Sequence, residues 1–542
     1  MLGLELHQRI EGVARGLAAD AFPQRVAEFT HCKGQHEQLG HALDRERDAA
    51  VAGLCLLALA RAQSDAELPI PAEDTETYDM VCQADTVGVF QSESRAQMSR
   101  LPRLRPRCFY DLVVEVAIVR PGPIVGGMVH PYLNRRQGKE PVSYPSDALK
   151  EALGRTLGVP VFQEQVMQIS ILAAGFTPGE ADGLRRAMAA WKRKGGLDRY
   201  YDKIVDGMTS RGYDKEFAEA IFKQIHGFSE YGFPESHASS FALLVYASCW
   251  IKKHHPAEFL AAMLNSQPLG FYSPSQLVQD AKRHGVEVRP ADVMVSAVDC
   301  TLEDLPHPPV VRLGLRMIAG LRSESMARIV AERHERVFDS AEDLARRARI
   351  EQHEMKILAA ADALMSLSGH RRQQVWDAAA LSSMPELLRD APFDEDILEL
   401  PHAPEGEEIL FDYASIGLTL RRHPMALLRP RLDQHRLLTA EQLNAMPNGR
   451  IVRYCGIVTL RQQPETANGT VFVSLEDETG VVQVICWKSL RERQRRVLLG
   501  SRLLAVYGTW QRVGEVKNLI AGQLQDLTPL LGRLATESRD FK

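Results

Sequence analysis

A Gly-Phe-Pro turn that ends at Pro234 is followed directly by a run of residues at helical spacing. Proline has no backbone N–H and does not fit inside a helix, so the chain turns here and a helix begins after it. Ser236, His237 and Ser239 lie at the start of that helix. Free backbone N–H groups and the positive end of the helix dipole favour an anion at such a place. Taken alone, the pattern is more typical of a capped, solvated corner than of a phosphate site.

The helix after this turn shows one apolar face. Phe241, Leu244 and Val245 recur at helical spacing and are expected to face a core. Tyr246 and Lys252 fall on other parts of the helix surface and are expected in solvent. The spacing therefore predicts a helix that is buried on one side.

Length and composition are those of a multidomain globular protein. The 542 residues are enough for about three or four domains, and 45% hydrophobic with 25% charged residues is ordinary for them. A formal net charge of -5 gives no overall attraction to nucleic acid, so local clusters must provide it. No apolar run of about 18 residues and no secretion signal occur, which predicts a cytoplasmic protein without a membrane partner. Eight scattered cysteines without a Cys-x-x-Cys pair predict reduced thiols and no zinc site.

A basic helix is expected from Gly179 to Lys194. Ala181, Leu184, Met188 and Trp191 form an apolar stripe at spacings of three and four, which predicts one packed face. The flanks carry cations that suit phosphate oxygens, because guanidinium groups bind such oxygens in pairs. A solvated surface explains the same charges. The cations are Arg185, Arg186, Lys192 and Arg193.

Two proline-containing turns present further arginines. In residues 100–107 the prolines prevent a long helix, so Arg103 and Arg105 project from a kinked loop, either as a solubilising surface or as contacts to DNA phosphates. Arg120 precedes a Pro-Gly-Pro sequence that fixes a stiff turn and holds its side chain in one place. Gln165 is suited to hydrogen-bond a base or sugar edge, and a satisfied buried amide network explains it at least as well.

Residues 310–381 read as small helices. A Gly-Leu hairpin at Gly320 precedes one of them, and residues 369–373 resemble a second copy. In a helix-hairpin-helix, backbone N–H groups of the hairpin grip a DNA phosphate. A glycine in a tight hairpin is also explained by backbone geometry alone. Residues 382–446 are rich in Pro, Glu and Asp and are expected to form an extended connector.

Residues 447–530 change to the alternation typical of β-strands. Three strands, a basic helix and two further strands are expected, which is the order of elements in an OB fold. On such folds exposed aromatic and cationic side chains hold single-stranded nucleic acid. Phe472 and Trp487 are the aromatic candidates, although a place in the core is the more usual one for both.

The sequence Phe-Pro-Glu-Ser-His-Ala-Ser-Ser-Phe-Ala at 233–242 resembles the fingers of the bacterial C-family DNA polymerases, the family of the polymerase III alpha subunit. Its form is that of the error-prone, damage-inducible branch. Arg-Pro-Gly-Pro at 120–123 and Leu-Arg-Arg-Ala-Met at 184–188 resemble the same family, and the resemblance covers about residues 76–542. It implies that the triphosphate of an incoming deoxynucleotide is held by Arg120, Arg185, Arg186, Ser236 and His237.

The resemblance also implies an architecture: a multidomain α+β protein, mainly helical, with a β-barrel at the carboxyl end. It implies template-directed DNA synthesis past damage during DNA repair, with primed or single-stranded DNA, deoxynucleoside triphosphates and other translesion or replication proteins as partners. The expected parts are a palm remnant (1–75), fingers (76–305), a helix-hairpin-helix region (310–381), a connector (382–446), an OB-fold domain (447–530) and a tail (531–542).

The amino-terminal part departs from the family pattern. Polymerases of the family hold Mg²⁺ ions with three palm aspartates, and these ions activate the primer hydroxyl and stabilise pyrophosphate. Cys55 stands where the third aspartate is expected, and no Asp-x-Asp occurs in residues 1–60. The ligands of Mg²⁺ are therefore not expected in this chain, and we expect little or no nucleotidyl transfer by the chain alone.

One other class of function fits the sequence. A non-catalytic nucleic-acid-binding protein, accessory to another polymerase, would need the same cations and the same OB fold. A synthetase that uses its OB fold to bind tRNA is disfavoured, because no nucleotide-activating motif accompanies the barrel.

Overall fold

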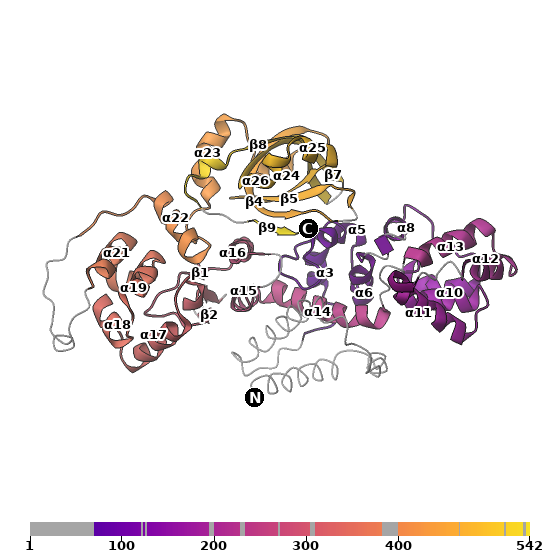
Figure 1. Ribbon diagram of the computed structural model, residues 1–542, viewed down its shortest axis with the longest axis horizontal. Helices are drawn as coiled ribbons and strands as arrows, with labels where there is room; N and C mark the ends of the chain where they lie inside the picture. Colours follow the sequence, from indigo (N-terminus) through magenta and orange to yellow (C-terminus); the bar gives the residue numbers. More distant parts are fainter. Residues whose placement is uncertain are drawn as a thin grey trace. The chain divides into compact units, whose positions relative to one another are not determined.

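The computed structural model describes residues 70–541, apart from residues 121–122, 125–126, 195–199, 228–233, 269–271, 304–308, 382–398, 465–466, 514–515 and 535–537. The chain forms two compact units that divide after His254. Figure 1 shows helices throughout and a strand-rich region near the carboxyl end. In the residues described, none of the helices is both long and apolar enough to cross a bilayer.

The first unit is helical where it is described, and α14 (Glu235–His254) is the longest helix among those described residues (Figure 1). α3 (Thr75–Cys82) and α6 (Phe109–Ile118) pack against α14, while α10 (Gln163–Leu172) packs against α9 and α11. The other elements are α4 (Arg95–Met98), α5 (Leu101–Leu104), α8 (Val129–Arg136), α9 (Asp147–Leu153), η2 (Gly154–Thr156), α11 (Pro178–Lys194), α12 (Tyr201–Thr209) and α13 (Lys215–Gly227).

The basic helix α11 forms as its pattern predicts. Ala181, Leu184 and Met188 are all buried, so the stripe is the packed face of the helix. The side chain of Trp191, expected to continue that stripe, lies outside the described residues, as do those of Lys192 and Arg193. The flanks that carry Arg185 and Arg186 remain partly open to solvent.

α14 is more deeply buried than its sequence predicts. Tyr246 and Lys252 were expected in solvent and are 2% and 3% exposed, so that expectation is wrong for both. The Tyr246 hydroxyl donates to the Pro71 carbonyl at 2.6 Å. The Lys252 ammonium donates to the Val87 carbonyl at 3.1 Å and pairs with Asp85 at 3.0 Å. Because these polar groups find partners inside the unit, the helix is buried on more than its apolar face.

The second unit begins with α15 (Pro256–Asn265) and α16 (Pro274–Arg283). A small sheet of order β1-β3-β2 follows, formed by β1 (Val288–Arg289), β2 (Thr301–Glu303) and β3 (Val310–Arg312). The predicted small helices come next. They are η4 (Leu315–Met317), α17 (Ser323–Glu335), α18 (Ala341–Arg347), α19 (Gln352–Ala360), α20 (Met365–Ser368) and α21 (Arg371–Ala380).

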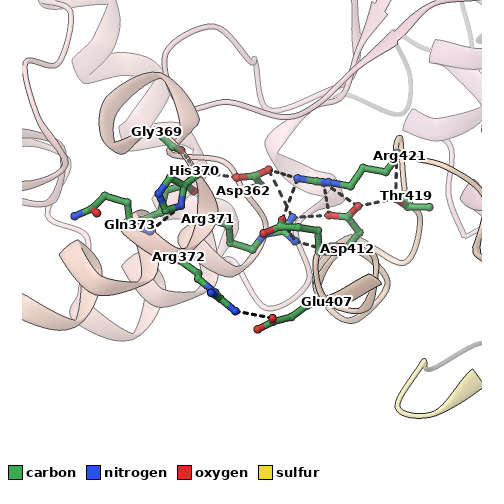
Figure 2. Close-up of polar contacts among 12 residues, drawn as sticks. Asp362, Gly369, His370, Arg371, Arg372, Gln373, Glu407, Asp412, Thr419 and Arg421 are labelled. Atoms are coloured by element: carbon green, nitrogen blue, oxygen red, sulfur yellow. Dashed lines mark hydrogen bonds and ion pairs between the residues drawn. The ribbon is translucent and has the colours of Figure 1, made fainter. Parts of the chain in front are cut away.

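The described part of the expected connector is helical and packed. It contains α22 (Glu405–Ile416), α23 (Pro424–Gln434) and α24 (Ala440–Ala445), where an extended chain was expected. α22 packs against α19 of the helix-hairpin-helix region. A buried cluster of two arginines and three carboxylates joins the two segments (Figure 2).

The carboxyl-terminal strands form the closed barrel of an OB fold, as predicted. Its strands are β4 (Ile451–Gln462), β5 (Val471–Asp477), β6 (Gly480–Cys486), β7 (Leu503–Val513) and β8 (Val516–Asp526). The order β5-β6-β8-β7-β4 closes through a pairing of β5 with β4, and β9 (Arg539–Phe541) adds to β4 in parallel. α25 (Lys488–Arg493) and α26 (Arg495–Gly500) stand between β6 and β7, in the OB-fold order. The η7 turn (Thr528–Leu531) follows β8.

Candidate functional site

The first residue of α14 is tied to three other elements. Its backbone N–H donates to Glu164 Oε2 at 3.0 Å, which occupies one of the free donors of the helix end. Its side chain accepts a hydrogen bond from the Tyr110 hydroxyl at 2.6 Å and pairs with Arg155 at 2.8 Å. Glu235 therefore joins α14 to α6, η2 and α10, and the residues after it start from a fixed position.

Ser236 and His237 follow this anchor. Ser236 is exposed, and the His237 ring lies edge-on to Phe241, with 4.4 Å between ring centroids. Phe241 in turn packs against Phe90, at 5.4 Å between centroids. The helix start therefore presents a hydroxyl to solvent and an imidazole whose ring is packed against aromatic neighbours.

Arg120 reaches the same neighbourhood from the end of α6. Its guanidinium donates to the side-chain oxygen of Gln91 at 2.9 Å. Gln91 is the neighbour of Phe90, which packs on Phe241. A chain of contacts through Gln91, Phe90 and Phe241 therefore runs from Arg120 to His237, two of the predicted phosphate ligands.

A buried carboxyl group lies beside Arg120. Glu115 is 1% exposed and accepts a hydrogen bond from the Ser92 hydroxyl at 3.2 Å. Burial raises the pKa of Glu115 to about 8, although Ser92, Arg120 and Arg100 each act in the opposite direction. Near neutral pH the carboxyl is therefore mainly protonated, and the positive charge of Arg120 is not cancelled by it.

Arg185 and Arg186 form a separate group on α11. In the part of the chain that the structure describes, their ion pairs go to Asp182, at 2.8 Å and 2.6 Å. Their side chains are 44% and 70% exposed. The hydrogen bond and charge of Arg185 and the charge of Arg186 lower the pKa of Asp182, so this carboxylate stays ionised. No described contact joins the arginine pair to α14.

Three family models match separate parts of the chain. A bacterial DNA polymerase III alpha subunit finger domain matches residues 56–212, a helix-hairpin-helix motif residues 285–374, and an OB-fold nucleic acid binding domain residues 452–527. An error-prone DNA polymerase of Bordetella bronchiseptica is 58% identical to this chain over 480 residues, which are 87% of this chain and 46% of that protein. The chain belongs to the C family of bacterial DNA polymerases.

Two other error-prone DNA polymerases match this chain with similar identity and coverage. The error-prone DNA polymerases of Alkalilimnicola ehrlichii and Methylococcus capsulatus are 55% identical over 473 residues and 54% identical over 492 residues. Each alignment covers 87% of this chain, with 46% and 47% of the relative. The chain therefore spans less than half the length of the curated relatives that it matches.

The helix-hairpin-helix region of this C-family chain has two unlike hairpins. Gly320 has a φ of +84°, a conformation that favours glycine, so geometry alone accounts for this residue. The Arg322 guanidinium next to it donates to Glu354 at 2.8 Å and 3.0 Å. At the second hairpin Arg371 is 2% exposed and pairs with Asp412, so it is not available to a DNA phosphate (Figure 2).

The OB barrel carries one aromatic residue on its surface where a core position was expected. Trp487 is 52% exposed at the start of α25, so the expectation that it lies in the core is wrong. Phe472 is half-buried on β5, opposite Ile485 of β6. The cations after Trp487 are solvated, as expected for the outer side of this helix pair. They include Lys488, Arg493, Arg495 and Arg496.

Two further sequence predictions have structural counterparts, and a third lies outside the described residues. Arg105 ends α5 in a left-handed conformation and is exposed, and Arg103 on α5 is half-buried. Gln165 is fully buried: its amide oxygen accepts from two backbone N–H groups and its amide nitrogen donates to Ala152 and Thr156, which confirms the amide-network interpretation. Cys55 lies outside the described residues.

Sequence reasoning missed the anchors behind the predicted ligands. Glu235 was seen only as part of a motif, and Tyr110, Arg155, Glu164 and Glu115 were not considered. Glu235 could have been noticed as an acidic residue in the first turn of a helix, where the dipole favours it. Its partners could not, because they lie 125 and 71 residues away for Tyr110 and Glu164.

Proposed function

We propose that this chain is the nucleotide- and DNA-binding part of an error-prone DNA polymerase, which extends a primer opposite damaged template bases. The observation that supports this best is the start of α14. There an exposed Ser236 and the packed imidazole of His237 follow an anchored residue, and Arg120 bonds Gln91, whose neighbour Phe90 packs on the Phe241 ring that His237 contacts. A hydroxyl, an imidazole and a guanidinium around one loop suit the oxygens of a polyphosphate.

Arg185 and Arg186 supply the remaining positive charge in this proposal. Their present partner, Asp182, is partly exposed, and such ion pairs near the surface contribute little to stability because water and salt screen them. A triphosphate carries more charge and more acceptor oxygens than one carboxylate, so it replaces Asp182 at little cost. Guanidinium forks bind phosphate oxygens in pairs, which arginine achieves better than lysine.

Mg²⁺ supplies the activation of the primer hydroxyl in polymerases of this kind. The sequence has no Asp-x-Asp in residues 1–60, and Cys55 takes the place of an expected aspartate. We therefore assign to this chain the binding and orientation of the nucleotide. Transfer of the nucleotidyl group by the chain alone is not expected.

DNA contacts are assigned to three surfaces. Arg103 and Arg105, with Lys192 and Arg193 of α11, are proposed to meet phosphates of the primed template. The hairpin at Gly320 offers backbone N–H groups to a phosphate of duplex DNA. Trp487 and Phe472, with the neighbouring cations, are proposed to hold the single-stranded template, because a base stacks on an exposed indole in any sequence. In this proposal the chain acts in the cytoplasm, and other translesion or replication proteins are its protein partners.

A direct test uses a fluorescent primer–template. The anisotropy of the DNA should rise on addition of the purified chain, more strongly at low salt, and the affinity should increase with the next correct deoxynucleotide. Primer extension with Mg²⁺ should be absent. Failure to bind DNA at low salt would refute the proposal, and binding that ignores the nucleotide would favour the accessory-protein alternative. Sustained extension would refute the assignment of binding without catalysis.

A further inference from the structure

We propose that Glu235 is a positioning residue for nucleotide binding, which acts together with Tyr110, Arg155 and Glu164 by fixing the first turn of α14. This inference rests on the proposed function, because Ser236 and His237 are the side chains that it positions. Glu235 itself is not assigned a contact with the nucleotide. The four residues are called the α14 anchor below.

The geometry of the α14 anchor is unusual for a helix end. One residue uses its backbone N–H and both carboxylate oxygens toward three different elements. Glu164 accepts the N–H at 3.0 Å, Tyr110 donates to Oε1 at 2.6 Å, and Arg155 pairs with Oε2 at 2.8 Å. A single contact leaves a helix end free to pivot, whereas three contacts from separate directions restrict both its rotation and its translation.

The charges of the α14 anchor depend on one another. Glu164 and Glu235 are neighbouring carboxylates, and burial, with the charge of Glu235 adding to it, raises the pKa of Glu164. The positive charge of Arg155 acts in the opposite direction and also pairs with Glu235. Arg155 therefore allows the two acidic groups to stay close together at the positive end of the helix.

The α14 anchor lies directly before the two predicted nucleotide ligands of this helix and therefore affects their positions first. Ser236 and His237 are the next two residues, and successive helical residues are about 100° apart around the axis. A change in the start of the helix therefore moves both side chains. The rest of α14 is held by other contacts, such as those of Tyr246 and Lys252, so loss of the anchor should leave the fold intact.

The experiment compares nucleotide affinity and thermal stability for the wild type, Glu235→Ala, Glu235→Gln and Arg155→Gln, in the presence of primed DNA. Glu140→Ala is the matched control, because it removes a partly exposed Arg–Glu pair (3.0 Å, with Arg135) that includes no residue of α14. We expect about tenfold weaker deoxynucleotide binding for Glu235→Ala and Arg155→Gln, the effect of about one charged hydrogen bond. Glu235→Gln, which keeps an acceptor for Tyr110, should lie between them and the wild type.

The possible results distinguish failure of the positioning role of Glu235 from failure of the proposed nucleotide-binding function. Weaker nucleotide binding by the anchor variants, with a midpoint of unfolding like that of Glu140→Ala, supports the positioning role. Nucleotide affinity within twofold of the wild type for Glu235→Ala overturns it while leaving the proposed function in place. If Glu235→Ala does not fold, the near-isosteric Glu235→Gln and Tyr110→Phe decide the matter by the same criterion. A wild type that binds no nucleotide overturns the proposed function and this inference together.

Discussion

Replacing Glu115 with glutamine tests whether the buried carboxyl group beside Arg120 is protonated in the folded chain. Glu115 is fully buried, and one of its oxygens, Oε1, accepts no hydrogen bond among the described residues. The Ser92 hydroxyl bonds the other oxygen at 3.2 Å, and glutamine offers the same acceptor with almost the same shape. The substitution therefore removes the ability to ionise and preserves the packing.

The magnitude follows from the pKa. Burial raises the pKa of Glu115 from its ordinary value of 4.5 to about 8. The folded chain therefore binds this proton more tightly than the unfolded chain does. The free energy of unfolding then falls as the pH rises from about 4.5 towards 8 and stays level above 8. The shift corresponds to about 5 kcal/mol at most. Glu115→Gln should match the wild type near pH 4.5 and be more stable by a few kcal/mol near pH 9.

The assay has to read the first unit by itself, because a chain with two compact units need not unfold in one step. Hydrogen exchange of the backbone amides of α6 and α14 provides such a local measurement. After correction for the intrinsic pH dependence of exchange, wild-type protection should decline between pH 5 and 9, and Glu115→Gln should lose that decline. Parallel curves for the two proteins would refute the assignment of a neutral buried carboxyl.

Three other predictions concern the second unit. Arg371→Met should lower the free energy of unfolding of the second unit by about 3–5 kcal/mol in urea denaturation, because it leaves the buried carboxylates of the cluster in Figure 2 without one of their cations. An effect below about 1 kcal/mol would contradict this prediction. Burial lowers the pKa of His423 to about 4, so the stability of the second unit should fall as the pH falls from 6.5 to 4. His423→Gln should reduce this loss of stability in thermal melts recorded across that pH range, and a pH profile equal to that of the wild type would contradict the prediction. Trp487→Ala should weaken binding of a short single-stranded oligonucleotide by about 1–3 kcal/mol by anisotropy, while Trp376→Ala, equally exposed on α21, should not; equal effects would remove the stacking assignment.

Local patterns in the sequence were enough for the elements with a strong period. The stripe of Ala181, Leu184 and Met188 predicted the packed face of α11, and the alternation after residue 447 predicted the OB-fold order of strands. These patterns work because burial of an apolar face is decided within one element. Family motifs named Arg120 and His237 as ligands of the same nucleotide, a proposal that no spacing in the sequence would have suggested.

Predictions failed where partners distant in the sequence decide burial. Lys252 is polar and was expected in solvent, but a carbonyl and a carboxylate inside the first unit satisfy it. Trp487 is apolar and was expected in the core, but it stands at the start of α25 with half its surface in solvent. The α22 helix was not predicted because residues 382–446 are rich in Pro, Glu and Asp. Its buried Asp412 is stabilised by ion pairs with Arg371 and Arg421, which the local sequence does not reveal.

Arg185, Arg186 and His237 are proposed to hold the triphosphate of an incoming deoxynucleotide. Equilibrium binding of a deoxynucleotide to the chain with primed DNA tests this proposal most directly, with Arg185→Ala/Arg186→Ala, His237→Ala and, as a charge-matched control at two exposed arginines that are assigned to no binding surface, Arg431→Ala/Arg533→Ala. We expect nucleotide affinity to fall at least about tenfold in the first two variants, as for the loss of a charged hydrogen bond, and to stay unchanged in the control. Equal nucleotide affinity in all four proteins, or no binding by the wild type, would contradict the claim.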